Sequence, residues 1–304
     1  MRTFYAWFFA LLFSFLSCSS ETAEAQKEIQ IDDDKVIEDG NSLLWKIEGK
    51  GCVTSYLYGT MHMIDAEYYN MTENMTEKIT SSKAIIMEVG GMPNPLEALS
   101  MMSLDSGTVH QYFTKDQMAE LLEFMDKELG TSPEVFHKTY GPMKPFFILQ
   151  SLSQGYFGEA TESYDLNIMG MASANEIPLI GLETVEEQLS FFDKIPNDKI
   201  AEMIMETIRN YDKEKKDTQK MMKIYHEQKV DKLIPLMNKQ SPEFMEFSDI
   251  FLYNRNKAWI PKIEKEISDK QCFIAVGAGH LFGEGGIIDL LKKEGYTLIP
   301  IATE

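Results

Sequence analysis

Short hydrophobic runs alternate with helical periodicities along the chain. The strand-like runs occupy residues 43–47, 55–58, 84–87, 177–182, 273–276 and 297–301. A turn containing Gly49 and Gly51 separates the first two runs, which predicts a β-hairpin. The third and fourth runs are apolar throughout, as expected for strands that a parallel sheet buries on both faces.

Helical patterns fill the sequence between these runs. Thr114 and Gln117 resemble a capping box, and they precede a face of apolar residues at helical spacing. Helical periodicity returns between about residues 196 and 268. The alternation predicts an α/β fold with a central mixed, mainly parallel sheet flanked by helices. The helical insertions are expected at about 100–160 and 190–268.

Composition and charge limit the classes of function that this protein can have. A hydrophobic content of 44 % is too high for general disorder and indicates a folded protein. The 48 acidic and 29 basic side chains give a formal charge of −19. This charge repels nucleic-acid phosphates, so we expect no nucleic-acid partner.

The first eighteen residues have the features of a secretory signal. Arg2 precedes an uncharged apolar stretch over 4–16, and Ser17 and Cys18 follow it. A small residue before cysteine resembles a lipoprotein processing site, so residues 1–18 are interpreted as a lipoprotein-type signal peptide with Cys18 as the lipidated residue. Ordinary cleavage with release of the product is the alternative.

The protein is therefore expected to be exported and anchored in a membrane, facing the periplasm or the cell exterior. Residues 19–40 are rich in acids and poor in large apolar side chains, which predicts a solvated tether. The folded domain is expected over 41–304. Outside the cytoplasm, Cys52 and Cys272 can form a disulfide or remain two buried thiols, and the sequence leaves both possibilities open.

The strongest chemical signal is a doubled motif. Gly59 lies three residues before His62, and Gly277 lies three residues before His280. Each motif ends a strand-like run, and functional groups gather at the carboxyl ends of parallel strands. We expect adjacent strands to bring both histidines together. Each glycine is expected to permit a positive φ and to let the backbone pass close to a ligand or a neighbouring strand.

Glu88 directly follows an apolar run, where a carboxylate needs a partner, a metal or solvent to avoid the cost of burial. Together with His62 and His280 it offers ligands that suit a divalent metal such as Mn²⁺, Co²⁺ or Zn²⁺. A metal held this way can convert a bound water to a nucleophile. The alternatives are that His62 and His280 are hydrogen-bonded parts of the core or of a turn, and that Glu88 caps a helix.

Six segments in order resemble the TraB/GumN family, which is related to the TIKI-type peptidases. They are Leu57–His62, Met87–Glu88, Glu162–Asp165, Gly181–Thr184 with Gln188, Arg255–Trp259, and Val276–Leu281 with Gly283. The resemblance covers nearly the whole mature domain. It implies a sheet-centred fold with both motifs and a glutamate in one cleft, and it assigns the catalytic or metal-binding role to His62, Glu88 and His280.

Arg255 follows a helical pattern and lies four residues before Trp259. It can stack on that ring, or it can hold a substrate carboxylate or a developing oxyanion, and the resemblance favours the functional role. Asp165 and Glu183 are interpreted as residues that orient the imidazoles or as structural caps.

The leading functional hypothesis is a metal-dependent hydrolase acting outside the cytoplasm, with peptides as the substrate class that the TIKI resemblance implies. Two alternatives stay open. One is a metal-free hydrolase that uses a histidine, similar to the erythromycin esterase proteins. The other is a protein that binds peptides or pheromones without cleaving them, as the resemblance to TraB-like members implies.

Overall fold

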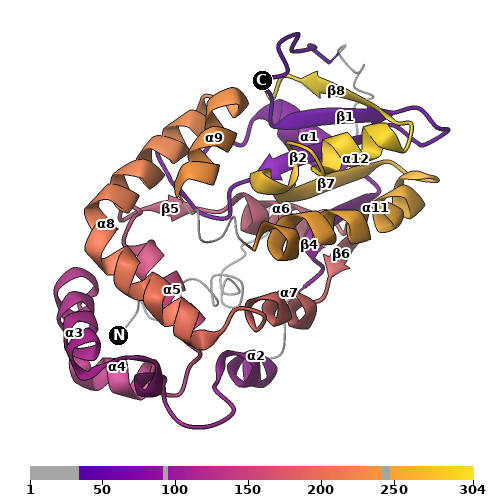
Figure 1. The fold of residues 1–304 in the computed structure, drawn as a ribbon. Coiled ribbons are helices and arrows are strands. Elements are labelled where there is room, and N and C mark those ends of the chain that lie inside the picture. Colours follow the sequence, from indigo (N-terminus) through magenta and orange to yellow (C-terminus); the bar gives the residue numbers. More distant parts are fainter. Residues whose placement is uncertain (1–33, 92–94, 241–246) are drawn as a thin grey trace.

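The computed structural model describes residues 34–91, 95–240 and 247–304 (Figure 1). Its main sheet has the strand order β6-β4-β7-β2-β1-β8. These strands are β1 (Leu44–Glu48), β2 (Ser55–Thr60), β4 (Ala84–Val89), β6 (Leu179–Glu183), β7 (Cys272–Gly277) and β8 (Thr297–Ile301). The pairs β6–β4, β4–β7 and β7–β2 are parallel, whereas β1 runs antiparallel to both β2 and β8. The predicted mixed, mainly parallel sheet and the first hairpin are confirmed.

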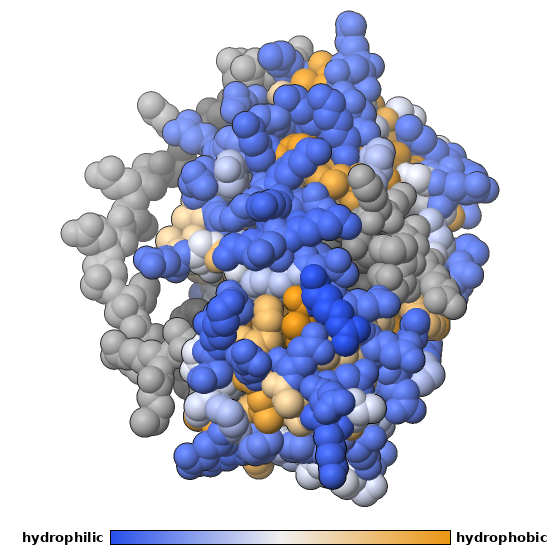
Figure 2. All heavy atoms as spheres, turned by 60° about the vertical axis from the view of Figure 1, so that its left-hand side comes forward, coloured by the Kyte–Doolittle hydropathy of each residue, from blue (hydrophilic) through white to orange (hydrophobic). Residues whose placement is uncertain are grey.

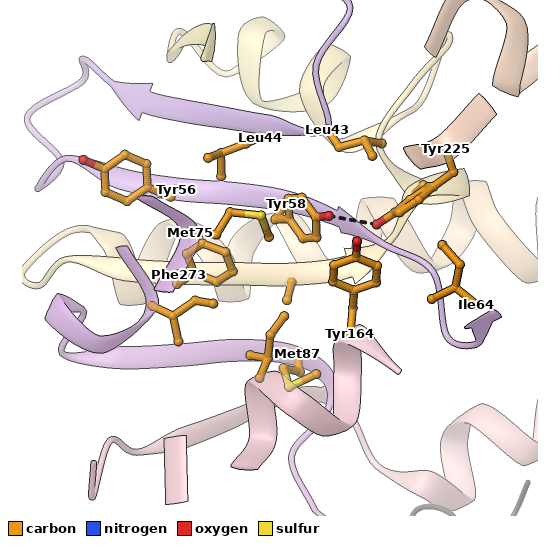
Figure 3. Close-up of a cluster of buried hydrophobic side chains, with 14 of the residues drawn as sticks. Leu43, Leu44, Tyr56, Tyr58, Ile64, Met75, Met87, Tyr164, Tyr225 and Phe273 are labelled. Atoms are coloured by element: carbon orange, nitrogen blue, oxygen red, sulfur yellow. Dashed lines mark hydrogen bonds between the residues drawn. The ribbon is translucent and has the colours of Figure 1, made fainter. Parts of the chain in front are cut away.

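Side chains alternate between two hydrophobic layers along the strands. In β2, Tyr56 and Tyr58 join the cluster beneath α1 (Glu73–Ser81) and α6 (Tyr164–Ala174), and Figure 3 shows this cluster. Leu57 points to the opposite face, where α11 (Asn254–Ile267) and α12 (Ile287–Lys293) pack. The sheet is thus the middle of three layers, because both its faces are apolar.

Other helices connect the strands of the sheet along the described chain. They are α2 (Pro95–Met102), η1 (Val109–Tyr112), α3 (Lys115–Leu129), α4 (Pro133–Thr139), α5 (Pro145–Gln154), α7 (Val185–Phe192), α8 (Asn197–His226), α9 (Val230–Gln240) and the π-helical turn η2 (Asp249–Tyr253). Thr114 and Gln117 form the expected capping box at α3. Helix α8 joins the two parts of the core, since Ile204 packs in the helical cluster and Tyr225 packs against the sheet.

The N-terminal end of the described chain lies along the sheet edge. Lys35 accepts a backbone hydrogen bond from Ala302, and Ile37 donates one to Pro300. The ammonium group of Lys78 lies 2.5 Å from the Asp34 carboxylate. Residues 34–40, the last part of the expected tether, therefore add to the packed domain. Residues 1–33, with the expected signal peptide and Cys18, lie outside the described residues.

The surface is mostly hydrophilic on the face in Figure 2, in keeping with the formal charge of −19. Within the described ranges, no helix combines the length and the apolar character that a membrane span needs. Cys52 and Cys272 are both free thiols in this structure.

The pairing of β2 with β7 brings the two glycine–histidine motifs side by side. The register places Gly59 opposite Val276 and Thr60 opposite Gly277. A Cβ on Gly59 would lie 3.1 Å from the Cα of Ala278, in the short turn η3 (Ala278–His280). Neither motif glycine has a positive φ, so that part of the expectation is wrong. Their conformations are open to any residue, and the close approach of neighbouring groups is what requires glycine.

We predict that Gly59→Ala lowers the free energy of unfolding by about 1–3 kcal/mol, because the new methyl group overpacks the contact between β2 and η3. Gly170→Ala is the control, since nothing lies within 4 Å of a Cβ at this position inside α6. That substitution should raise stability by about 0.5–1 kcal/mol through helix propensity. Urea unfolding of both variants measures the two effects. Equal free energies of unfolding for Gly59→Ala and the parent protein would show that the close contact with η3 does not exclude a side chain at residue 59.

Candidate active site

The site forms where β2, β4 and β7 end next to one another. A Cβ on Gly277 would lie 3.2 Å from Glu88 Oε1, 3.5 Å from His62 Nε2 and 3.8 Å from His280 Cδ2. The three predicted residues therefore surround one small space beside the Gly277 backbone. The parallel strands explain this convergence, because their carboxyl ends meet at the same edge of the sheet.

Glu88 is a buried carboxylate whose oxygens are both hydrogen-bonded. Oε1 accepts the N–H of Gly277 at 2.9 Å, and Oε2 accepts from Arg255 at 2.7 Å and from Gln188 at 3.0 Å. Burial alone raises the pKa of Glu88, but its neighbours His280 and Arg255 outweigh burial and hold the pKa well below its usual value. Glu88 is therefore ionised at neutral pH.

His62 is the accessible member of the group, with 60 % of its side chain exposed. Its Nδ1 lies 2.9 Å from Asp165 Oδ2, while Thr60 donates to the other carboxylate oxygen at 3.1 Å. The Asp165 charge raises the pKa of His62 to about 9, although solvent around the exposed ring screens part of this attraction. The imidazole is thus held as an imidazolium, with Nε2 facing the site.

His280 is buried, and its environment has the opposite effect. Its Nδ1 lies 2.7 Å from Asn256 Oδ1, and its Nε2 lies 3.3 Å from Arg255 Nη1 and 3.7 Å from Glu88 Oε1. Burial is the main reason that the pKa of His280 is lowered to about 4. His280 is therefore neutral at pH 7, while His62 is charged.

Arg255 connects the buried charges from its position near the start of α11. Its Nε and Nη2 contact Glu183 at 2.9–3.1 Å, Nη2 also contacts Glu88, and Nη1 donates to the backbone oxygen of Phe251 at 2.9 Å. With the bond from Nη1 to His280, all five N–H groups of the guanidinium have protein acceptors. The group also lies over the Trp259 ring at 4.8 Å, so the expected stacking is present together with the contact to Glu88.

Asp165 and Glu183, the two residues expected to orient the imidazoles, contact different partners. Asp165 contacts the imidazole of His62, as the sequence predicts. Glu183 contacts Arg255 and the indole N–H of Trp259, the latter at 2.9 Å, so its target is the arginine and not an imidazole. Glu183 ends β6 beside β4, and this neighbouring position brings its carboxylate close to Glu88 and Arg255.

A divalent metal fits the site in ligand chemistry but not in arrangement. Two imidazoles and a carboxylate are suitable ligands for Zn²⁺, Mn²⁺ or Co²⁺. Within the described part of the chain, however, no group of three or more His, Cys, Asp and Glu side chains is placed to hold an ion. The Arg255 guanidinium already contacts both Glu88 and His280, and its charge would repel a second cation between them.

Sequence reasoning assigned no role to two residues of the site. Asn256 contacts His280, and Gln188 contacts Glu88. Both lie within the segments that carry the family resemblance, and this was the only available signal. Neutral amides carry no charge that marks them as functional, and their partners are distant in the sequence.

Comparison with known proteins agrees with the motifs. The profile of the TraB/PrgY/gumN family matches residues 43–300. Uncharacterized protein YbaP of Shigella flexneri is 24 % identical over 260 residues, which cover 83 % of this chain and 94 % of that protein. Uncharacterized protein YbaP of Escherichia coli (strain K12) is 23 % identical over 241 residues, or 78 % and 87 % of the two chains. No solved structure matches. Since the family profile spans nearly all of the folded domain, the chain belongs to the TraB/PrgY/gumN family.

Proposed function

We propose that the protein is a hydrolase that cleaves a carbonyl-type bond, with peptides as its substrate class, and that the site needs no metal. The supporting observation is the convergence of His62, Glu88 and His280 around the Gly277 backbone. Within this group the two imidazoles have pKa values that are shifted in opposite directions, to about 9 and about 4. Such a separation is how a site obtains an acid and a base at the same pH.

His62 is the proton donor in this proposal. It is charged, it is exposed to an approaching substrate, and Asp165 fixes its ring through Nδ1. The remaining N–H, on Nε2, faces the space beside Gly277. From there it can protonate the leaving group as the scissile bond breaks.

Glu88 and the neutral His280 are the proton acceptors for the attacking water. Glu88 Oε1 and His280 Nε2 lie 3.7 Å apart on the inner side of the site. A water that donates one hydrogen bond to Glu88 Oε1 and, in exchange for the long Arg255 contact, one to His280 Nε2 would direct a lone pair outwards, toward the substrate carbonyl. The proton that leaves the water passes to this acceptor pair.

Arg255 contributes its charge from a fixed position. Because its five N–H groups already have acceptors in the protein, we propose that it stabilises negative charge across the site and keeps Glu88 ionised. The expected direct contact with a substrate carboxylate or an oxyanion stays a prediction. For that contact, one of the five hydrogen bonds would have to be exchanged. The bond to His280, at 3.3 Å, is the longest of them.

The donor role of His62 predicts a dependence on the leaving group. With a peptide substrate, His62→Ala should lower kcat by about 10²–10⁴-fold, because a proton donor is lost. With a p-nitrophenyl ester of the same acyl group the loss should be below about tenfold, since this leaving group departs without protonation. A mixture of unstructured peptides, analysed by mass spectrometry, supplies the peptide substrate.

The matched control is His226→Ala, which removes an exposed histidine on α8 whose Nδ1 lies 2.8 Å from the backbone oxygen of Tyr68. This variant should keep the activity of the parent protein on both substrates. An equal loss on the peptide and on the ester in His62→Ala would contradict the donor role. Full activity in His62→Ala would remove His62 from the mechanism.

The shifted pKa values predict a broad plateau in the pH profile of kcat/KM. Activity should fall below about pH 4, where His280 gains a proton, and above about pH 9, where His62 loses its proton. Because Asp165 is the main cause of the raised value, Asp165→Asn should move the alkaline limb down toward the ordinary histidine value of about 6.5. An unchanged alkaline limb in Asp165→Asn would assign that limb to another group. Exposed Asp231→Asn serves as the control variant.

The metal-dependent hydrolase of the sequence analysis is the second candidate, and the convergence of two imidazoles with a carboxylate favours it. In that case His62, Glu88 and His280 would hold the ion, after movement of the Arg255 side chain. Dialysis against a chelator separates the two hydrolase candidates. Retained turnover supports the metal-free site, whereas loss that Mn²⁺, Co²⁺ or Zn²⁺ reverses supports the metal. Stoichiometric peptide binding without products would support the binding protein instead.

Export and membrane anchoring also belong to this proposal, and they rest on the sequence of residues 1–18. We predict that the mature chain begins at Cys18 and carries a lipid there. Mass spectrometry of the N-terminal peptide from membrane fractions should show this modification, and Cys18→Ala should release the protein from those fractions. An unmodified mature N-terminus at another residue would contradict the anchor.

A further inference from the structure

Asn256 lies almost fully buried on α11, with 1 % of its surface exposed, directly behind the second histidine motif. Its side-chain amide makes three hydrogen bonds with that region. Nδ2 donates to the backbone oxygens of His280 at 3.2 Å and Gly285 at 2.9 Å, and Oδ1 lies 2.7 Å from His280 Nδ1.

The two backbone oxygens fix which way the amide points. A carbonyl oxygen only accepts hydrogen bonds, so the group that faces the oxygens of His280 and Gly285 must be the NH₂ donor. A flipped amide would place its own oxygen against both carbonyls and leave buried acceptors unpaired, which is costly. The Asn256 oxygen is therefore the atom that faces the imidazole.

The orientation of the amide in turn fixes the tautomer of His280. Since Asn256 Oδ1 only accepts, His280 Nδ1 must carry the ring proton of the neutral imidazole. Nε2 is then the ring nitrogen that carries the lone pair and accepts hydrogen bonds. A separate contact agrees, because the Arg255 guanidinium, which only donates, lies 3.3 Å from Nε2.

We propose that Asn256 is a positioning residue that holds His280 in the Nδ1–H tautomer. Nε2 is then an acceptor, and it forms with Glu88 Oε1 a paired acceptor for one water when the 3.3 Å contact from Arg255 is exchanged. With the other tautomer, the Nε2–H would donate toward Glu88 and oppose the Arg255 N–H, and the water would lose one acceptor. The catalytic consequence rests on the proposed hydrolase function. The tautomer itself does not depend on it.

The test reads the tautomer directly. Nitrogen NMR of the full chain, labelled with ¹⁵N-histidine, distinguishes Nδ1–H from Nε2–H for each ring, and a His280→Gln sample assigns the His280 signals. Near neutral pH the parent protein should show Nδ1–H at His280. Asn256→Leu removes the acceptor and should populate Nε2–H.

Asn254→Leu, an exposed position two residues earlier on the same helix, is the control and should leave the His280 signals unchanged. The proposal is overturned if the parent protein shows Nε2–H, or if Asn256→Leu keeps Nδ1–H alone. The measurement on the parent protein decides the matter even if Asn256→Leu does not fold. In a folded variant, unchanged signals from the other four histidines show that the substitution acts locally.

The activity measurement separates this inference from the hydrolase function. With the substrate from the peptide screen, Asn256→Leu should lower kcat by about 10²-fold with little change in KM, as expected for a misplaced acceptor. An unchanged kcat in a variant that shows Nε2–H would overturn the catalytic role of Asn256. If no substrate is cleaved at all but the tautomer is Nδ1–H, the hydrolase proposal fails and the assigned tautomer stands.

Discussion

The buried guanidinium of Arg255 is the interaction on which the site depends. It lies between the carboxylates of Glu88 and Glu183, and all three side chains are less than a tenth exposed. Burying a carboxylate without a partner costs several kcal/mol, and two of them so close would repel each other. One arginine from α11 offsets both charges. These ion pairs link the ends of β4 and β6 to α11.

This charge also contributes to the difference between the two histidines, whose main causes are the burial of His280 and the charge of Asp165 beside His62. Arg255 lies next to His280, and its positive charge adds to burial in keeping that ring neutral. His62 lies farther out, beside Asp165, and gains a proton. A single cluster thus holds one neutral and one charged imidazole, because one is buried beside a cation and the other is exposed beside an anion.

Helix α8 takes part in holding the site. Tyr225, near the end of α8, donates a hydrogen bond to the backbone oxygen of Gly59 at 2.7 Å. Its hydroxyl also lies 3.0 Å from the hydroxyl of Tyr58, and Figure 3 shows these two side chains pointing toward each other. These contacts fix the end of β2, from which Thr60 and His62 extend. Helix α8 therefore supports the first motif through a buried tyrosine.

The sequence by itself determined the elements and the list of reactive residues. Short apolar runs, a capping box at Thr114 and the repeated glycine spacing are local signals, and each depends only on neighbouring residues. They were sufficient to predict the mixed sheet and to single out His62, Glu88 and His280. Only the tertiary structure decided that Glu183 contacts Arg255, that Asn256 contacts His280 and that the guanidinium contacts both Glu88 and His280. Those outcomes arise from contacts between segments separated by 24 to 167 positions, and burial and charge at such contacts have no local signature.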